Sequence, residues 1–256
     1  KKDKNIFITG SENSYLRSLA LKMRAEIINH NNFIGGRYSV LSEVGMLPAS
    51  LMGLNENKFK QLNNLIKNKN FINLLVSNVS STLFFIKNKK FNSIILNYDN
   101  SSDNLFNWYQ QLIAESLGKK GKGIQPIIST MPKDNHSLMQ LYLDGPKNNF
   151  FTFFSAKEKN TSKIVSSKIL KSHNYLKNKT LDEIRFSQKI ATENVFLKKN
   201  IPFRSFEVIN KSEESLGELF CFFILETILL GRALKVNPYD QPSVELIKEE
   251  TKKILV

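Results

Sequence analysis

Short apolar runs alternate along the chain with longer stretches in which apolar residues recur every three or four positions. The short runs are typical of buried strands, and the longer stretches are typical of helices with one buried face. We expect strands at residues 5–9, 26–29, 93–98, 124–129, 150–155 and 203–209. We expect helices at residues 16–23, 40–54, 59–86, 105–117, 135–143, 181–197, 216–230 and 243–255. This order predicts an α/β fold, a three-layer αβα sandwich in which helices cover both faces of a parallel sheet.

Local signals refine several helix ends. Ser11 or Asn13 is expected to cap the first helix, and Pro48 is expected to kink or restart the second. The long helical region is expected to break near Lys69, and residues 160–179 are polar and show no regular pattern.

The most polar motifs follow or precede these elements. Gly-Gly-Arg comes after the second strand, Asn-His-Ser after the strand at 124–129, and Tyr-Asp-Gln-Pro before the last helix. Ligands of open parallel sheets bind beyond the carboxyl ends of the strands. We therefore expect all three motifs at those ends.

The chain carries a formal charge of +14, from 37 lysines and arginines against 23 aspartates and glutamates. Such a charge can attract nucleic acid, an anionic membrane or a phosphorylated small molecule. The lysines are dispersed, and the phenylalanines at 151–154 and 220–223 lie inside apolar segments. A nucleic-acid surface instead combines clustered cations with interleaved aromatics. We therefore expect no nucleic-acid partner and attribute most of the charge to a solvated surface.

Cys221 is the single cysteine, so a disulfide within the chain and a cysteine-based metal site are excluded. The longest apolar run, residues 219–225, is far shorter than the roughly 20 residues of a membrane span and predicts a buried helix. No signal peptide is visible. We expect a cytoplasmic protein that binds no membrane and uses neither a metal nor a redox cofactor.

Several polar residues are candidates for chemistry. Glu115 lies near the end of the 105–117 helix, where spacing alone favours an ion pair with Lys119 four residues later. His136 stands where a helix should begin, a position at which a histidine is more often structural. Arg37 follows two glycines, which either let the backbone approach a ligand or mark an ordinary surface turn.

The most distinctive motif is Asn-Pro-Tyr-Asp-Gln-Pro at residues 237–242. Pro242 suits the first position of a helix. Gln241 and Lys248 are seven residues apart and would share one helical face, either at a binding site or on an amphipathic terminal helix. Residues 118–123 are rich in glycine and lysine but lack the residue order of a P-loop.

Four segments carry a resemblance to a known family: GGRYSVLSEVG at 35–45, QQLIAESLGKKGKG at 110–123, NHSLMQLYLDGP at 135–146 and NPYDQPSVELIK at 237–248. In this order they resemble the carboxy-terminal part of glucose-6-phosphate isomerases. The resemblance implies two sugar-isomerase (SIS-type) α/β domains. Residues 1–45 would be the tail of the first domain, and residues 46–256 would be the second domain with its terminal helices.

The family activity is the interconversion of glucose 6-phosphate and fructose 6-phosphate, in glycolysis and gluconeogenesis, by proton transfer through an enediolate. The resemblance makes Glu115 the base that moves the proton between two carbons. It makes Arg37, beside Gly36, the cation near the developing negative charge. No cofactor is implied.

The resemblance assigns His136 and Lys248 to opening of the sugar ring, and Gln241 to binding near the substrate phosphate. It also implies a homodimer in which His136 completes the active site of the partner subunit. His30 and His173 have no such context and are expected to be surface or packing residues.

The chain departs from the family pattern at three positions. Glu43 stands where a small residue is usual, and Ser243 and Ile247 replace glycines. The Ser/Thr-rich loop that holds the substrate phosphate would lie upstream of Gly-Gly-Arg, and the sequence contains no such loop. We therefore expect an incomplete copy that is inactive, or nearly so, by itself.

Two other functions stay open. One is a non-catalytic phosphosugar-binding SIS-type module, which would not need to keep Glu115, His136 and Lys248 together. Their joint presence favours the enzyme. The other is an isomerase that also accepts mannose 6-phosphate.

Overall fold

The computed structural model describes residues 5–157, 162–164 and 169–256. The chain divides into two compact units. The first unit comprises residues 1–76 and 212–226, and the second comprises residues 77–211 and 227–256. The division passes through helices α4 (Lys69–Lys87) and α9 (Glu213–Ala233). The domain boundary expected between residues 45 and 46 stays a prediction.

The first unit starts with β1 (Ile6–Thr9), α1 (Tyr15–Met23) and β2 (Glu26–Asn29). The two strands pair in parallel, as the strand–helix–strand pattern predicts. The cap of α1 is Ser14, whose hydroxyl accepts the backbone N–H of Arg17 at 3.2 Å. The expectation of Ser11 or Asn13 was wrong, because Ser14 is the residue with extended backbone immediately before the helix.

Short helices complete the first unit: the 3₁₀ helix η2 (Gly36–Leu41), α2 (Glu43–Leu51), the 3₁₀ helix η3 (Glu56–Phe59) and α3 (Leu62–Leu65). Pro48 lies inside α2 and does not restart it. The predicted break in the long helical region is confirmed, because α3 ends at Leu65 and α4 begins at Lys69.

The second unit contains a four-stranded sheet, and all of its strands are parallel. Its elements are β3 (Asn92–Asn97), α5 (Asp103–Leu117), β4 (Gln125–Thr130), α6 (Asp134–Ser137), α7 (Met139–Asp144), β5 (Asn149–Ala156), α8 (Leu181–Lys198), β6 (Phe203–Val208) and α10 (Pro242–Leu255). The strand order is β4-β3-β5-β6. The expected helix at 135–143 is thus two short helices, and part of the polar stretch 160–179 lies outside the described residues.

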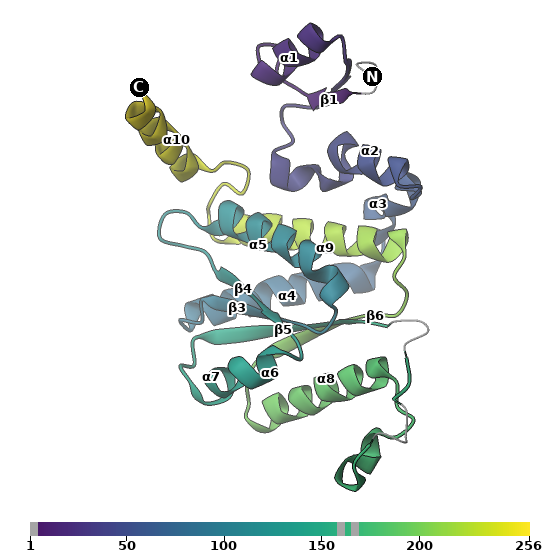
Figure 1. Cartoon of the computed structure of the whole chain (residues 1–256). Helices are drawn as coiled ribbons and strands as arrows, with labels where there is room; N and C mark the ends of the chain where they lie inside the picture. The colour runs from purple at the N-terminus through teal and green to yellow at the C-terminus, as the bar shows by residue number, and fades with distance from the viewer. Residues whose placement is uncertain (1–4, 158–161, 165–168) are drawn as a thin grey trace. The chain divides into compact units, whose positions relative to one another are not determined.

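Helices cover both faces of this sheet (Figure 1). On one face, Phe151 and Phe153 of β5 pack against Phe196 of α8, with ring centroids 4.8 and 5.2 Å apart. On the other face, Phe106 of α5 packs edge-on against Phe154 at 4.8 Å. Successive strand residues point to opposite faces, so the apolar run of β5 feeds both layers. The predicted α/β fold with a parallel sheet is confirmed.

Because its strands run one way, the sheet has two different edges. We call the side where β3 to β6 end the carboxyl edge, and the side where they begin the amino edge. Each connecting helix starts at the carboxyl edge and returns to the amino edge. The beginning and the end of α5 therefore lie at opposite edges.

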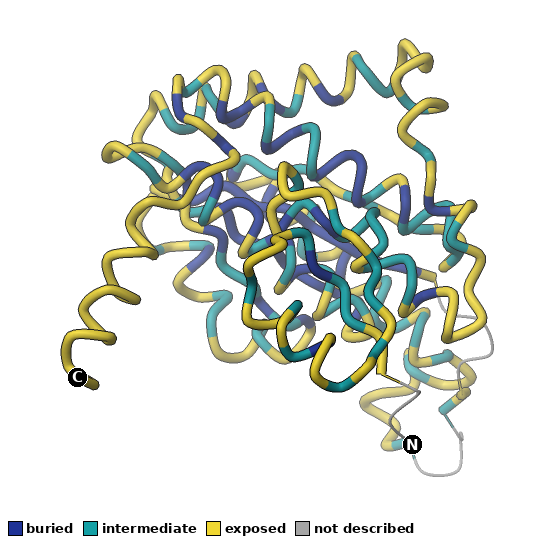
Figure 2. The backbone as a smooth tube through the Cα atoms, turned by 90° about the horizontal axis from the view of Figure 1, so that it is seen from above, coloured by how far each residue is buried: buried dark blue, intermediate teal, exposed yellow. Residues whose placement is uncertain are grey.

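The terminal helix α10 contains no buried residue, and Figure 2 shows it exposed along its whole length. No helix in the described part of the chain combines the length and the apolar character needed to cross a membrane.

Candidate active site

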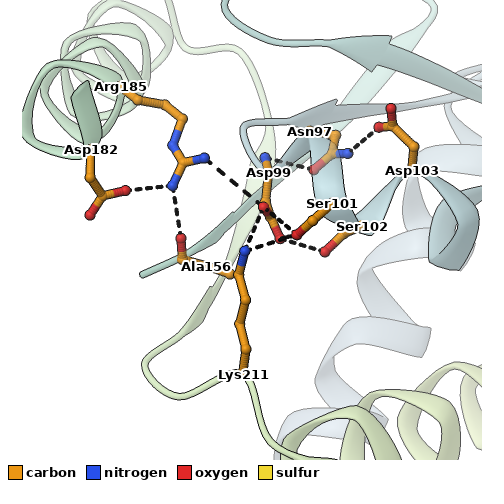
Figure 3. Close-up of polar contacts among 9 residues, drawn as sticks. All are labelled: Asn97, Asp99, Ser101, Ser102, Asp103, Ala156, Asp182, Arg185 and Lys211. Carbon is orange, nitrogen blue, oxygen red and sulfur yellow. Dashed lines mark hydrogen bonds and ion pairs between the residues drawn. The ribbon is translucent and has the colours of Figure 1, made fainter. Parts of the chain in front are cut away.

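The carboxyl edge holds a dense polar cluster around Asp99 (Figure 3). The Asp99 side chain follows β3 and is 1% exposed. The Ser102 hydroxyl donates to it at 2.6 Å, and the Lys211 ammonium lies 2.9 Å from it. Arg185, from the start of α8, lies 4.0 Å from the same carboxylate and donates to the carbonyl of Ala156 at 3.1 Å. The cluster thus joins the ends of β3 and β5 to α8 and to the loop after β6.

The charges in this cluster balance. Lys211 and Arg185 face Asp99 and Asp182, and Arg185 forms an ion pair with Asp182 as well. Burial by itself would raise the pKa of Asp99, but hydrogen bonds from Ser102, Lys211 and Ser101 outweigh that effect and lower the pKa. The cluster therefore keeps its carboxylate ionised at neutral pH.

This cluster occupies the place where ligands are expected. The strand order reverses between β3 and β5, and sheets of this type bind ligands at the carboxyl side of that point. The cavity beside it, lined by residues such as Tyr98, Ser155 and Phe186, measures only ≈ 10 Å³. That volume is about the minimum for one water molecule. The side chains of the Asp99 cluster thus occupy this point, and the cavity beside them is too small for a sugar phosphate.

Glu115 lies near the carboxy-terminal end of α5 and hence at the amino edge. It is partly buried, and the Gln111 side chain one turn earlier donates to its carboxylate at 2.9 Å. Spacing favours an ion pair between Glu115 and Lys119, but Lys119 pairs with Asp240 at 2.8 Å instead. The helix ends at Leu117, so Lys119 no longer follows the helical register that an i,i+4 pair requires.

Two lysines of the 118–123 turn attach the Asn-Pro-Tyr-Asp segment to the end of α5. The Lys119 ammonium donates to the carbonyl of Asn237, and the Lys122 ammonium donates to the carbonyl of Leu234 at 2.8 Å. The Lys119 side chain is 10% exposed, and its hydrogen bond lowers the pKa of Asp240. The structure therefore brings Glu115 and the segment before Gln241 to one edge.

This arrangement corrects one expectation. The Tyr-Asp-Gln-Pro motif was expected at the carboxyl ends of the strands, but it lies beside the amino edge. The cause is that the turn after α5, which leads into the start of β4, supplies the lysines that hold it.

Gln241 precedes α10, and Pro242 is the first residue of that helix, as predicted. Lys248 is exposed, and its ammonium lies 2.8 Å from Glu245. Ile247, the bulky replacement beside it, is 70% exposed and meets no obstruction in this chain.

His136 lies in α6 directly after β4, at the carboxyl edge, and its side chain is exposed. Asp134 shapes this turn by accepting from the Ser129 hydroxyl at 2.9 Å and from the Thr130 backbone N–H at 2.8 Å. Burial would raise the pKa of Asp134, but hydrogen bonds from Ser129, Ser137 and Thr130 outweigh it and lower the pKa.

Glu115 and His136 of one chain are held apart by the sheet. Gln110 of α5 donates to the carbonyl of Pro126 at 2.9 Å, which fixes the middle of the helix beside the start of β4. Five more helical residues reach Glu115, and four strand residues lead the opposite way to Thr130. At about 1.5 Å per helical residue and 3.3 Å per strand residue, the separation is roughly 20 Å. One small substrate cannot contact both residues of the same chain.

Gly36 and Arg37 belong to η2 in the first unit. Arg37 is 4% exposed, and its guanidinium carbon lies 5.4 Å from the centre of the Tyr38 ring. Gly35 has a φ of −66°, which any residue can adopt, so the backbone shape does not require glycine there. A Cβ at Gly35 or Gly36 would meet no atom within 4 Å, so both glycines border open space.

The structure also assigns contacts to two residues that the sequence left without a role. His30, expected at the surface or in packing, forms an ion pair with Glu43 and also contacts the carbonyl of Ile34 at 3.0 Å. The one sequence signal for this contact was Glu43 itself, which stands where the family usually has a small residue. No pattern in the sequence pointed from Glu43 to His30, thirteen positions earlier.

Comparison with known proteins gives a consistent assignment. Residues 11–256 match the family model described as phosphoglucose isomerase. The chain is 35% identical over 229 residues to a glucose-6-phosphate isomerase of Mycoplasmopsis pulmonis, covering 87% of this chain and 54% of that protein. It is 31% identical over 259 residues to one of Methanocaldococcus jannaschii, covering 99% of this chain and 62% of that protein. The chain thus spans little more than half the length of these curated relatives.

Solved structures agree on the fold. A Thermus thermophilus protein described as hypothetical superposes with a TM-score of 0.88 at 24% identity, covering 98% of this chain and 62% of that one. A glucose-6-phosphate isomerase from Chlamydia trachomatis superposes with a TM-score of 0.75 at 18% identity, covering 98% of this chain and 52% of that one.

Proposed function

The chain belongs to the phosphoglucose isomerase family, and from this premise we propose that the protein carrying it interconverts glucose 6-phosphate and fructose 6-phosphate. The reaction would serve glycolysis and gluconeogenesis in the cytoplasm and would need no cofactor. The observation that carries the proposal is the family match over residues 11–256, which includes every residue that we assign to the chemistry.

Glu115 is the proposed base. It would take the proton from C2 of the open-chain glucose 6-phosphate and return it to C1, through an enediolate. The Gln111 contact at 2.9 Å supports this role, because it orients a carboxylate oxygen of Glu115. The partial burial of Glu115 limits competition from water.

Arg37 is the proposed electrostatic stabiliser. A cation held in place next to a developing oxyanion lowers the barrier, because it needs no reorganisation when the charge forms. The burial of Arg37 and the open space at Gly35 and Gly36 support this role. The two glycines would let the substrate approach the backbone closely.

His136 would move the proton that opens the sugar ring, with Lys248 beside the ring oxygen and Gln241 near the phosphate. The separation of roughly 20 Å between Glu115 and His136 within one chain supports a site built from two copies. We propose a homodimer in which His136 of each copy completes the site of the other. Both the exposure of His136 and that of Lys248 suit groups that meet a second surface.

The domain assignment follows the same premise. Residues 1–45 would belong to the first SIS-type domain and residues 46–256 to the second. The separate pairing of β1 with β2, apart from the four-stranded sheet, supports this assignment.

A coupled assay of the full-length protein tests the proposal. Fructose 6-phosphate should be converted to glucose 6-phosphate, which a dehydrogenase then oxidises with a measurable change in absorbance. Turnover supports the isomerase. A folded, dimeric sample without turnover that still binds fructose 6-phosphate by calorimetry would instead identify the non-catalytic phosphosugar-binding module. A parallel assay with mannose 6-phosphate would determine specificity at C2.

A further inference from the structure

The loop that carries Arg37 is closed at its two ends by one side-chain pair. The loop comprises residues 31–42, between β2 and α2. His30 precedes it, and its backbone N–H donates to the carbonyl of Thr9 at 3.2 Å. Glu43 follows it as the first residue of α2, and the two side chains form an ion pair. The pair therefore bridges the two ends of the loop.

Inside the loop, hydroxyl groups fix the backbone on both sides of Arg37. The Ser39 hydroxyl donates to the carbonyl of Gly36 at 2.7 Å, and the Ser42 hydroxyl donates to the carbonyl of Ser39 at 2.7 Å. Asn31 accepts the N–H of Phe33 at 2.9 Å. The loop is thus a connected unit, and a movement at its ends would be passed on to Arg37.

His30 contacts two acceptors at once. Its Nδ1 faces the Glu43 carboxylate, and its Nε2 lies 3.0 Å from the carbonyl of Ile34. An ionised carboxylate and a backbone carbonyl only accept, so with Glu43 ionised both contacts are hydrogen bonds only when both ring nitrogens carry a proton. A neutral ring keeps one contact and loses the other. The geometry therefore requires the charged form of His30.

We propose that His30 and Glu43 are positioning residues that form a proton-dependent clasp, which holds the 31–42 loop so that Arg37 is fixed for the phosphosugar. The proposal rests on the isomerase function given above. His30 and Glu43 touch no substrate and act through Arg37.

Burial and charge support the clasp. The side chains of His30 and Glu43 are 15% and 32% exposed, whereas those of the Lys58–Glu214 pair in the same unit are 48% and 40% exposed. The hydrogen bond to Glu43 raises the pKa of His30. The pKa of Glu43 is lowered, first by its own backbone N–H and then by His30.

The charged groups around His30 come from two helices. Glu43 of α2 acts on the ring directly, and Arg17 of α1 donates to the side chain of Asn29, the residue before His30, at 3.1 Å. Within the described residues, no charged group other than Glu43 contributes to the shift of His30.

The direction of the pH dependence follows from these shifts. His30 has a raised pKa, so its stabilisation is complete below the ordinary value of 6.5 and is lost as the pH rises through the raised value. Glu43 has a lowered pKa, so its stabilisation is complete above the ordinary value of 4.5 and is lost as the pH falls through the lowered value. The clasp is therefore fully closed from about pH 4.5 to 6.5 and opens on the alkaline side.

The test uses the full-length protein and the variant Glu43→Gln. The amide keeps an acceptor for His30 but removes the charge, so the ring loses its proton at lower pH. In the wild type, kcat/KM should decrease on the alkaline side as His30 loses its proton. In Glu43→Gln we expect this decrease to occur about one pH unit lower. The His30→Ala variant should lower kcat/KM roughly tenfold and remove this decrease, since one or two hydrogen bonds are lost.

His173→Ala is the matched control, because His173 is exposed and lies outside the loop. It should leave the profile unchanged. Histidine NMR provides an independent reading: the resonance that is absent in His30→Ala should titrate above pH 6.5 in the wild type and at lower pH in Glu43→Gln.

Two results would overturn the clasp. One is a pH profile of Glu43→Gln that superimposes on that of the wild type. The other is a loss of thermal stability in His30→Ala with no change in the profile, which would make the pair merely structural. Failure of the proposed function is separate: the wild type would then show no turnover, while the NMR titration would still report on the pair.

Discussion

The two edges of the four-stranded sheet use the same kinds of residues but differ in how far these residues are buried. At the carboxyl edge, Asp99 is 1% exposed and bound by two hydroxyls and an ammonium. At the amino edge, Glu115 is only partly buried. The Asp99 carboxylate is thus shielded from solvent, whereas the Glu115 side chain keeps part of its surface accessible.

This difference distinguishes a carboxylate that stabilises the fold from one that is available for reaction. A buried charge that is fully paired would lose much of its stabilisation if it reacted, since removing either partner leaves the other uncompensated. A partly exposed carboxylate that is held in place by its neighbours can exchange a proton with a ligand. We therefore assign stability to the Asp99 cluster and reactivity to Glu115.

The largest expected effect belongs to Glu115. Replacing it with glutamine keeps the shape and the contact with Gln111 but removes the proposed base, so kcat should fall about 10³-fold with little change in KM. A coupled assay of the full-length protein measures this. Glu207→Gln is the control, because Glu207 lies 3.7 Å from Lys157 in an exposed pair, and it should behave as the wild type. Equal activity of the two variants would remove Glu115 from the chemistry.

The opposite pattern is expected at the carboxyl edge. Asp99→Asn should lower the free energy of unfolding by about 1.5–3 kcal/mol, because the hydrogen bonds of Ser102 and Lys211 lose their charged acceptor. Turnover per folded molecule should stay close to that of the wild type. Urea unfolding of Asp99→Asn and of Asp144→Asn measures both effects. Asp144 forms an exposed ion pair with Lys199, so its replacement should lower the free energy of unfolding by less than about 1 kcal/mol.

The pH dependence of this effect has a definite sign. The pKa of Asp99 is lowered in the folded state, so its stabilisation is present above the ordinary value of 3.8 and is lost as the pH falls through the lowered value. The stability difference between wild type and Asp99→Asn should therefore shrink in strong acid. A difference that grew in acid would contradict the assignment.

A smaller effect is expected where the amino edge attaches to the segment before Gln241. Lys119→Met removes its hydrogen bonds to Asn237 and Asp240, worth about 1 kcal/mol, so KM should rise roughly fivefold while kcat changes little. Lys120→Met, at the exposed neighbour, is the control. Equal KM values for the two variants would show that this attachment does not position the site.

Periodicity was sufficient for most of the fold. Within the described residues, the apolar runs predicted the six strands to within two residues at each end. The expected helix at 135–143 failed in detail: the chain forms α6 and α7 instead, separated at Leu138. Helical spacing of apolar residues does not reveal such a break.

The candidate site was less accessible to sequence reasoning. Spacing paired Glu115 with Lys119, but the end of α5 at Leu117 redirects that lysine to Asp240. The clasp of His30 and Glu43 joins residues that no periodic pattern relates. Long-range polar contacts of this kind depend on where loops bring side chains together, and loop geometry is not encoded in apolar spacing.

The central claim is that each active site takes Glu115 from one copy and His136 from the other. Glu115→Gln and His136→Ala proteins are each purified, mixed in equal amounts, dissociated and allowed to reassociate. If the site is shared, mixed dimers contain one intact site, and about a quarter of wild-type activity should return, because half of randomly formed dimers are mixed. Mixed dimers that form, as shown by a tag on one variant, but recover no activity beyond that of the separate variants would contradict the account, since both residues would then serve the same site from one chain.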